Sequence, residues 1–186
     1  MTISPIEAEA SLAAIAATRR ESVDRLRYRR AAPYVIGWGL VWAVGYAGSA
    51  MLPVVWASWL WIGLIVAMSA LTVVMVRRRT GSTIGWLKIA AYTVLPTVGL
   101  IGLVNVIAAV FDIHSTVGVS ALFCLLVAFA YAVSGLRYGA RYMAMGIGLL
   151  ALTAAGLLVL PPGLRMGVFF IDALVLISAG LWLRRA

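Results

Sequence analysis

An aspartate inside an apolar segment is the residue of this sequence with the clearest chemical meaning. Asp172 lies between the apolar runs 169–171 and 173–175. A charged side chain at membrane depth costs at least about 2.5–3.5 kcal/mol on insertion scales, so such a residue faces the interior of a helix bundle. Burial also favours the neutral carboxylic acid, which makes a proton-linked role chemically possible. The alternative is a neutral or hydrogen-bonded aspartate that only ties helices together.

Arg165 and Asn105 are the polar residues best placed to share a site with Asp172. Arg165 lies one heptad before Asp172, on the same face of a helix, and can partially neutralise the carboxylate. Asn105 lies in an earlier apolar segment, at a similar expected depth below the outer surface. We therefore predict a ligand or proton site that involves these three residues.

Asp112 and His114 form a second polar group, in a short connection between two apolar segments. Because histidine changes its charge near neutral pH, this pair is able to report external acidification. The alternative is that both side chains only satisfy backbone groups of the turn and water. A lipid-modifying enzyme is a further hypothesis, and it requires Asp112, His114, Arg165 and Asp172 to converge at the outer surface.

The sequence lacks the residues that haem, zinc or serine-nucleophile sites require. A single histidine cannot provide a bis-histidine haem site, and no cluster of histidine, aspartate and glutamate has the spacing of a zinc site. Cys124 is the only cysteine, and no serine lies in a Gly-x-Ser-x-Gly elbow. We therefore expect no catalytic residue, no metal and no cofactor, and we expect that the protein is not an enzyme.

The elements that position these residues are membrane-spanning helices. The chain of 186 residues is 64% hydrophobic and 11% charged, whereas soluble domains are about 45–50% apolar and about 25% charged. Its mean hydropathy is +1.05. About 20 apolar residues span a bilayer as a helix. The sequence predicts an all-α fold with six such helices, arranged as three antiparallel hairpins, over residues 33–52, 54–76, 86–111, 117–136, 142–160 and 164–183.

The distribution of arginine predicts the orientation of these helices. Basic clusters precede the first helix and follow the second, fourth and sixth, whereas the other connections contain only Arg165. Because cytoplasmic connections carry the excess of lysine and arginine, both termini are predicted to be cytoplasmic in a bacterial inner membrane. The formal charge of +9 therefore indicates membrane orientation, and we expect no nucleic acid partner.

Residues 4–30 are predicted to form a helix ahead of the bundle, which divides the chain into residues 1–30 and 31–186. Ser4 suits the N-cap and Pro5 the first helical position. Leu12, Ile15 and neighbouring apolar residues favour one side of this helix. The segment either docks a cytoplasmic protein or a second copy of the chain, or lies on anionic lipid headgroups. The basic residues expected to make these contacts are Arg19, Arg20, Arg25, Arg27, Arg29 and Arg30.

Two resemblances add to this interpretation. The segments 134–137 (SGLR), 146–150 (GIGLL) and 160–162 (LPP) resemble the bacterial acid-resistance membrane protein family, which has a three-hairpin plan. Residues 7–27, followed by 38–46 (WGLVWAVGY), resemble uncharacterised bacterial six-helix membrane proteins with a cytoplasmic helical preamble. The resemblances imply a stress-related or regulatory membrane component.

We therefore predict a non-catalytic membrane protein that acts through protein–protein contacts, with residues 4–30 as its docking element. The alternative is a small transporter or substrate-binding membrane subunit with its site near Asp172 and Asn105.

Overall fold

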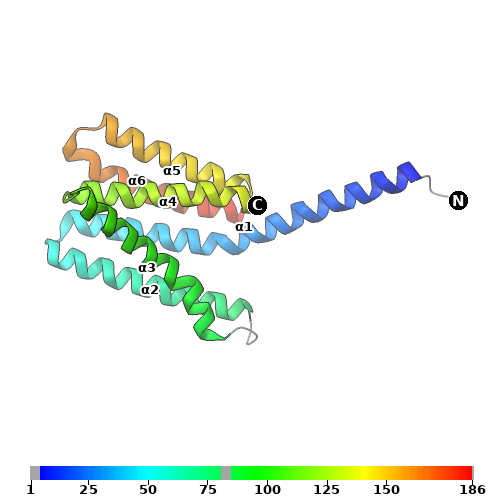
Figure 1. Ribbon diagram of the computed structural model, residues 1–186, viewed down its shortest axis with the longest axis horizontal. Helices are drawn as coiled ribbons and strands as arrows, with labels where there is room; N and C mark the ends of the chain where they lie inside the picture. The colour runs from blue at the N-terminus through cyan, green and yellow to red at the C-terminus, as the bar shows by residue number, and fades with distance from the viewer. Residues whose placement is uncertain (1–4, 81–84, 186) are drawn as a thin grey trace.

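The computed structural model describes residues 5–80 and 85–185, and the described chain is helical throughout (Figure 1). The all-α prediction is therefore confirmed. A short 3-10 turn, Pro162–Leu164, precedes the last helix. The six α-helices are α1 (Pro5–Met51), α2 (Val54–Thr80), α3 (Trp86–Val110), α4 (Thr116–Tyr138), α5 (Ala140–Val159) and α6 (Arg165–Arg184).

Five of these helices, α2 to α6, are long and apolar enough to cross a membrane, which is consistent with a membrane protein. Their ends lie within a few residues of the predicted boundaries. Arg77, Arg78 and Arg79, which were expected in a loop, form the last turn of α2. Their positive charges complement the negative end of the helix dipole.

The second half of α1 packs in the bundle and combines apolar residues with weakly polar ones. Glycine, tyrosine and tryptophan are frequent between residues 34 and 48. Ala32, Val35, Trp42 and Tyr46 are buried in the core of the bundle. Leu40 and Val44 of the same segment are 51% and 48% exposed, so only one side of it faces the bundle core.

The N-terminal segment and the first apolar segment form one helix, although the sequence predicts a division between residues 30 and 31. α1 continues from Pro5 to Met51 and contains Pro33 in its interior. A proline inside a helix removes one hydrogen bond and exposes nearby carbonyl groups. The Arg79 guanidinium of α2 donates a hydrogen bond of 2.6 Å to the Arg30 carbonyl, three residues before Pro33. The carbonyl that loses its helical donor at Pro33 is that of Arg29, four residues earlier, so this contact lies next to the interrupted hydrogen bond.

The most extensive packing is between helices that are not neighbours in the predicted hairpins. α1 packs mainly on α6, and α4 packs mainly on α5, while α2 and α3 make fewer contacts with the rest (Figure 1). A Cβ atom on Gly39 would lie 3.0 Å from the Ile177 backbone nitrogen, and one on Gly180 would lie 3.0 Å from the Ile36 nitrogen. Such small residues let helix backbones approach closely in membrane proteins.

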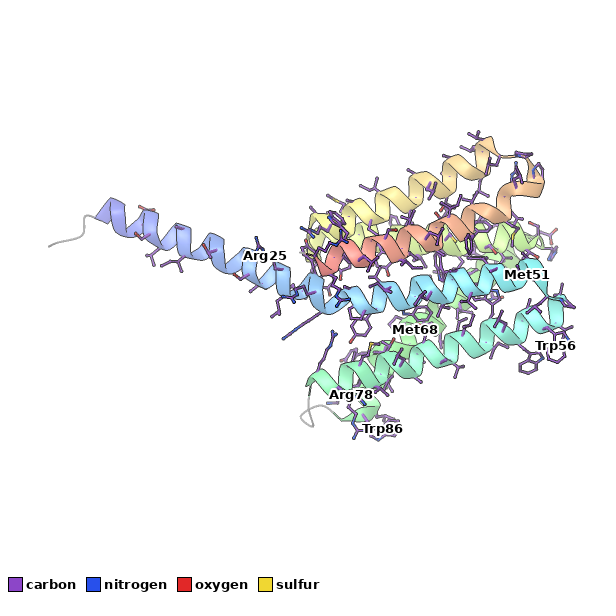
Figure 2. All side chains as sticks on the ribbon, turned by 180° about the vertical axis from the view of Figure 1, so that it is seen from behind. Arg25, Met51, Trp56, Met68, Arg78 and Trp86 are labelled. Atoms are coloured by element: carbon purple, nitrogen blue, oxygen red, sulfur yellow. The ribbon has the colours of Figure 1, made fainter. Side chains whose placement is uncertain are left out.

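The first half of α1 extends beyond the bundle. Figure 1 shows it leading away from the other helices toward the N-terminus. In Figure 2 it leaves the bundle at the end where Arg78 lies, whereas Met51 and Trp56 lie at the opposite end. We call the first of these the arginine-rich end, because Arg79, Arg141 and Arg184 also belong to it.

Candidate functional site

Asp172 lies in the interior of the bundle, as the sequence predicts. Its side chain has no solvent-exposed surface, and its Oδ2 atom lies 2.8 Å from the Thr153 hydroxyl oxygen of α5. The Thr153 oxygen also lies 2.8 Å from the Leu149 carbonyl oxygen, one turn earlier in α5. Asp172 Oδ1 is the buried side-chain oxygen that lacks a partner among the described residues. A polar contact therefore ties α5 to α6 at this depth.

Two further helices meet Asp172 through residues that the sequence did not single out. Tyr46 of α1 and Cys124 of α4 are both buried, and the Tyr46 hydroxyl lies 3.6 Å from the Cys124 sulfur. Both groups lie within electrostatic range of the Asp172 carboxyl group, without a hydrogen bond to it. We call Tyr46, Cys124, Thr153 and Asp172 the Asp172 cluster. Contacts between residues this distant in the chain leave no local signal in the sequence.

Tyr46 also joins the cluster to an aromatic and polar layer of α1 and α2. Its ring packs edge-on against that of Trp61, with centroids 5.1 Å apart, and at a tilt of 32° against that of Phe169, with centroids 5.3 Å apart. The Trp61 indole nitrogen donates a hydrogen bond of 2.9 Å to the Ser49 hydroxyl. Tyr46 is therefore fixed by ring contacts on one side while its hydroxyl faces Cys124.

A cavity of about 270 Å³ lies beside this layer. Tyr46, Ser49, Trp61, Asn105 and Ser120 contribute polar groups to its lining, together with apolar residues of α3 and α4. This is slightly smaller than the 300–1,000 Å³ of typical ligand pockets. Thr116, at the start of α4, also lines this cavity. We call it the outer cavity, because the start of α4 lies at the end of the bundle opposite the arginine-rich end.

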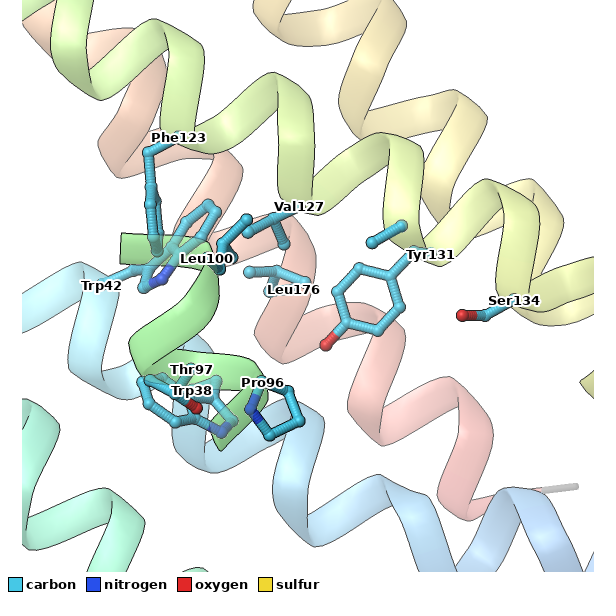
Figure 3. Close-up of a pocket in the computed structure, with 11 residues that line it drawn as sticks. Trp38, Trp42, Pro96, Thr97, Leu100, Phe123, Val127, Tyr131, Ser134 and Leu176 are labelled. Atoms are coloured by element: carbon cyan, nitrogen blue, oxygen red, sulfur yellow. The ribbon is translucent and has the colours of Figure 1, made fainter. Parts of the chain in front are cut away.

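A second cavity, of about 240 Å³, lies nearer the arginine-rich end, where Trp38 and Ser134 line it (Figure 3). Its lining combines the rings of Trp38, Trp42, Phe123 and Tyr131 with the Pro96 turn of α3. Figure 3 shows that α3 covers this space and that the Tyr131 hydroxyl points toward it. Phe123 lines both cavities, so the two spaces are neighbours. Pro96, which removes a hydrogen bond from α3, occurs where this helix covers the cavity.

Asn105 and Arg165 do not bond to Asp172. The Asn105 side-chain nitrogen donates a hydrogen bond of 2.8 Å to the Ile101 carbonyl within α3. The Arg165 Nε atom donates one of 3.1 Å to the Leu160 carbonyl, and Arg165 makes no ion pair with Asp172. The structure thus brings Asn105 to the outer cavity and Arg165 to the turn before α6. The predicted three-residue site is not formed by direct contacts.

Asp112 and His114 pair with each other at the end of α3. His114 Nε2 lies 2.7 Å from Asp112 Oδ1, and the two side chains are 81% and 89% exposed, respectively. Asp112 has a φ angle of 56°, and the Ile113 N–H donates a hydrogen bond of 2.8 Å to the Ala108 carbonyl. This is the helix-terminating motif in which one residue adopts the left-handed conformation, which aspartate tolerates better than most.

The four residues of the lipid-modifying hypothesis therefore do not converge. Asp112 and His114 are exposed in the turn after α3, while Asp172 is fully buried beside Thr153. Arg165 is engaged with the chain before α6. Within residues 5–80 and 85–185, no three histidine, cysteine, aspartate or glutamate side chains come together as a metal site would require.

The predicted basic contact residues lie on the extended half of α1. Arg25, Arg27, Arg29 and Arg30 are exposed, while the side chains of Arg19 and Arg20 lie outside the described part of the structure. Four large apolar residues on the same segment are also exposed: Leu12 by 67%, Ile15 by 64%, Val23 by 41% and Leu26 by 50%. Their spacing places them near one side of the helix.

Aromatic rings fix the point at which α1 leaves the bundle. Tyr28 is buried, with its ring 5.9 Å from that of Tyr142. The Arg141 guanidinium lies 5.4 Å from the Tyr28 ring and 4.8 Å from the Trp182 ring, and it donates a hydrogen bond of 3.2 Å to the Trp182 carbonyl. Contacts of this kind stabilise by about 0.5–1 kcal/mol at exposed sites. The direction of the extended half is therefore anchored on α5 and α6.

Comparisons with protein-family models, with curated proteins and with solved structures find no match to this chain. The two resemblances drawn from short segments therefore stay predictions.

Proposed function

We propose that this protein is a non-catalytic membrane protein that acts through contact with another protein, and that the first half of α1 is the docking element. The observation that supports it is the exposed apolar side of residues 12–26 on a helix that extends beyond the bundle. Residues 5–27 reach about 35 Å as a helix. In this role the protein is a regulatory or stress-related component.

The proposed topology has six crossings with both ends in the cytoplasm of a bacterium. The second half of α1 supports the sixth crossing, because it runs beside α6 through the bundle. Arginines at the end of α2, between α4 and α5 and at the end of α6 support the orientation, since cytoplasmic ends carry more basic residues. With this orientation the first half of α1 points into the cytoplasm.

The direction of α1 favours a protein partner over the lipid surface. A helix that lies on headgroups runs in the plane of the membrane, with its apolar side in the acyl boundary. The first half of α1 instead continues the course of a helix that passes through the bundle. Leu12 and Ile15 lie farthest from the bundle among the four exposed apolar residues, so they are the furthest from lipid. The arginines nearest the bundle, Arg29 and Arg30, are the ones placed to meet anionic headgroups.

The test is a deletion of residues 1–24 in the full protein, which keeps the buried Tyr28 and its contacts with the bundle. We expect the truncated protein to fold as a bundle, measured by its helical circular dichroism and its elution as a single species in detergent, and to lose its protein partner. Leu12→Ser with Ile15→Ser is a finer test, and Ala14→Ser, an exposed position on the other side, is its matched control. Retention of the same partner by the deletion variant would contradict the proposal.

A second candidate is a small transporter or substrate-binding subunit, and the two cavities favour it. Both are lined by aromatic rings and hydroxyl groups and lie beside α3, which packs loosely on its neighbours. A cryo-electron microscopy map in lipid nanodiscs tests this candidate. Non-protein density in the cavities, displaced by Ser120→Trp in the outer one, would support it, whereas side chains filling both spaces would contradict it.

A further inference from the structure

If Asp172 were ionised, the hydrogen-bond acceptors around the Thr153 hydroxyl would outnumber the protons available for them. The Thr153 hydroxyl has one proton but lies 2.8 Å from two oxygen atoms, the Leu149 carbonyl oxygen and Asp172 Oδ2. A carbonyl oxygen only accepts, and an ionised carboxylate also only accepts. One of the two short contacts would then join oxygen atoms with no proton between them. A carboxylic acid at Asp172 removes the conflict, because it donates to Thr153 while Thr153 donates to Leu149.

Among the residues that the structure describes, no positively charged group faces Asp172. The titratable groups that face it from other helices are Tyr46 of α1 and Cys124 of α4, and neither carries a positive charge in any protonation state. α5 contributes the Thr153 hydroxyl. On α6 itself, the nearest basic residue, Arg165, bonds to Leu160 instead. Burial of an ionised carboxylate without a cation is far more costly than burial of the neutral acid.

The second carboxyl oxygen agrees with the neutral form. Asp172 Oδ1 has no hydrogen-bond partner among the described residues, although it is buried. In a carboxylate this oxygen carries half of the negative charge, and leaving it unpaired is more costly than leaving a neutral carbonyl oxygen unpaired. Both oxygen atoms of Asp172 therefore favour a bound proton.

The outer cavity offers a path for that proton. Tyr46 belongs both to the Asp172 cluster and to the lining of the outer cavity. Ser120, one turn before Cys124 on α4, lines the same cavity, and Ser49 and Asn105 add further polar groups. Hydroxyl groups that both donate and accept can pass a proton between water in the cavity and the cluster. In the other direction, the hydrogen bonds run from Asp172 to Thr153 and end at the Leu149 carbonyl, which has no proton to pass on.

We propose that Asp172 is a proton-binding site in the interior of the bundle, occupied at neutral pH and in exchange with the outer cavity through Tyr46 and Ser120. The ligand of this site is a proton. The site stands apart from the docking role of α1, since it is formed by the bundle and lies far from residues 12–26.

Infrared spectroscopy of the full protein in lipid vesicles at neutral pH tests the first part of this proposal. The carbonyl stretch of a carboxylic acid is separate from the bands of carboxylates and amides. We expect one such band in the wild type, complete loss of it in Asp172→Asn, and no change in Asp112→Asn, whose carboxyl group is exposed. A wild-type spectrum without an acid band, or a band that survives in Asp172→Asn, would overturn the proposal.

Two further infrared measurements, one on Thr153→Val and one of deuterium exchange, keep the test valid if Asp172→Asn folds poorly. Thr153→Val removes the acceptor of the acid proton, so the acid band should persist at higher frequency. Transfer of the wild type to D2O should shift the band as deuterium replaces the proton, and Ser120→Leu should slow this shift at least tenfold. A band that Thr153→Val does not move would contradict the bonding scheme. A deuterium shift that is equally fast in Ser120→Leu would overturn the path through the outer cavity.

Discussion

Replacement of Gly39 by alanine is expected to weaken the α1–α6 interface. The added Cβ would lie 2.8 Å from Ile177 Cγ1, 3.0 Å from the Ile177 backbone nitrogen and 3.2 Å from the Ala173 carbonyl oxygen. Two of these atoms belong to the backbone of α6, so rotation of a side chain cannot relieve the contact and the helices must separate. Overpacking of this kind costs about 1–3 kcal/mol.

A second effect acts in the opposite direction. Alanine is better than glycine within a helix by about 0.8–1 kcal/mol. Gly63→Ala on α2 is the matched control, because nothing lies within 4 Å of a Cβ atom there. The helix-propensity gain is common to both variants, and the difference between them isolates the packing cost. We expect Gly39→Ala to be less stable than Gly63→Ala by about 1–3 kcal/mol, or about 5- to 150-fold in the unfolding equilibrium constant.

The assay is reversible unfolding of the purified protein in mixed detergent micelles, followed by helical circular dichroism. Gly180→Ala should behave like Gly39→Ala, since its Cβ would lie 3.0 Å from the Ile36 backbone nitrogen. Equal stability of Gly39→Ala and Gly63→Ala would refute the close approach of α1 and α6.

Three more variants test individual contacts with the same unfolding assay. Thr153→Val leaves the buried carboxyl group of Asp172 without a partner and should cost about 1–3 kcal/mol, whereas Thr153→Ser should cost less because it keeps the hydroxyl. Asp112→Val places a branched side chain at a φ angle of 56° and should cost about 1–2 kcal/mol, while Asp112→Asn should be close to the wild type. Arg79→Ala loses the cation–π contact with Tyr34 and should cost about 0.5–1 kcal/mol, and Arg79→Lys should retain part of it. Equal stability within any of these pairs would contradict the corresponding contact.

The helices could be predicted from the sequence because a bilayer sets their length. Apolar segments of about 20 residues, separated by proline, glycine and arginine, leave few choices for their ends. The course of α1 could not be predicted in this way. Pro33 normally marks a helix boundary, yet α1 continues through it, and α1 packs on α6, which is far away in the chain.

The site could be predicted only in part. The burial of Asp172 follows from the cost of a charge in hydrocarbon, so it can be predicted without knowing which residues surround the carboxyl group. The partners depend on how each helix is rotated about its axis. α3 is apolar nearly all round, so its sequence does not determine that Asn105 faces the outer cavity and bonds within its own helix. Tyr46, Cys124 and Thr153 look like ordinary interior residues until the helices are assembled.

Site-specific photocrosslinking from the first half of α1 tests the docking proposal most directly. A photoreactive side chain replaces Ile15, which is 64% exposed, or Ala14, which is exposed on the other side of the helix. The full protein is irradiated in native membranes, and the products are identified by mass spectrometry. We predict a crosslink to one defined protein chain from position 15 and little or none from position 14. Crosslinks to lipid alone, or equal crosslinks from both positions, would contradict the docking role of α1.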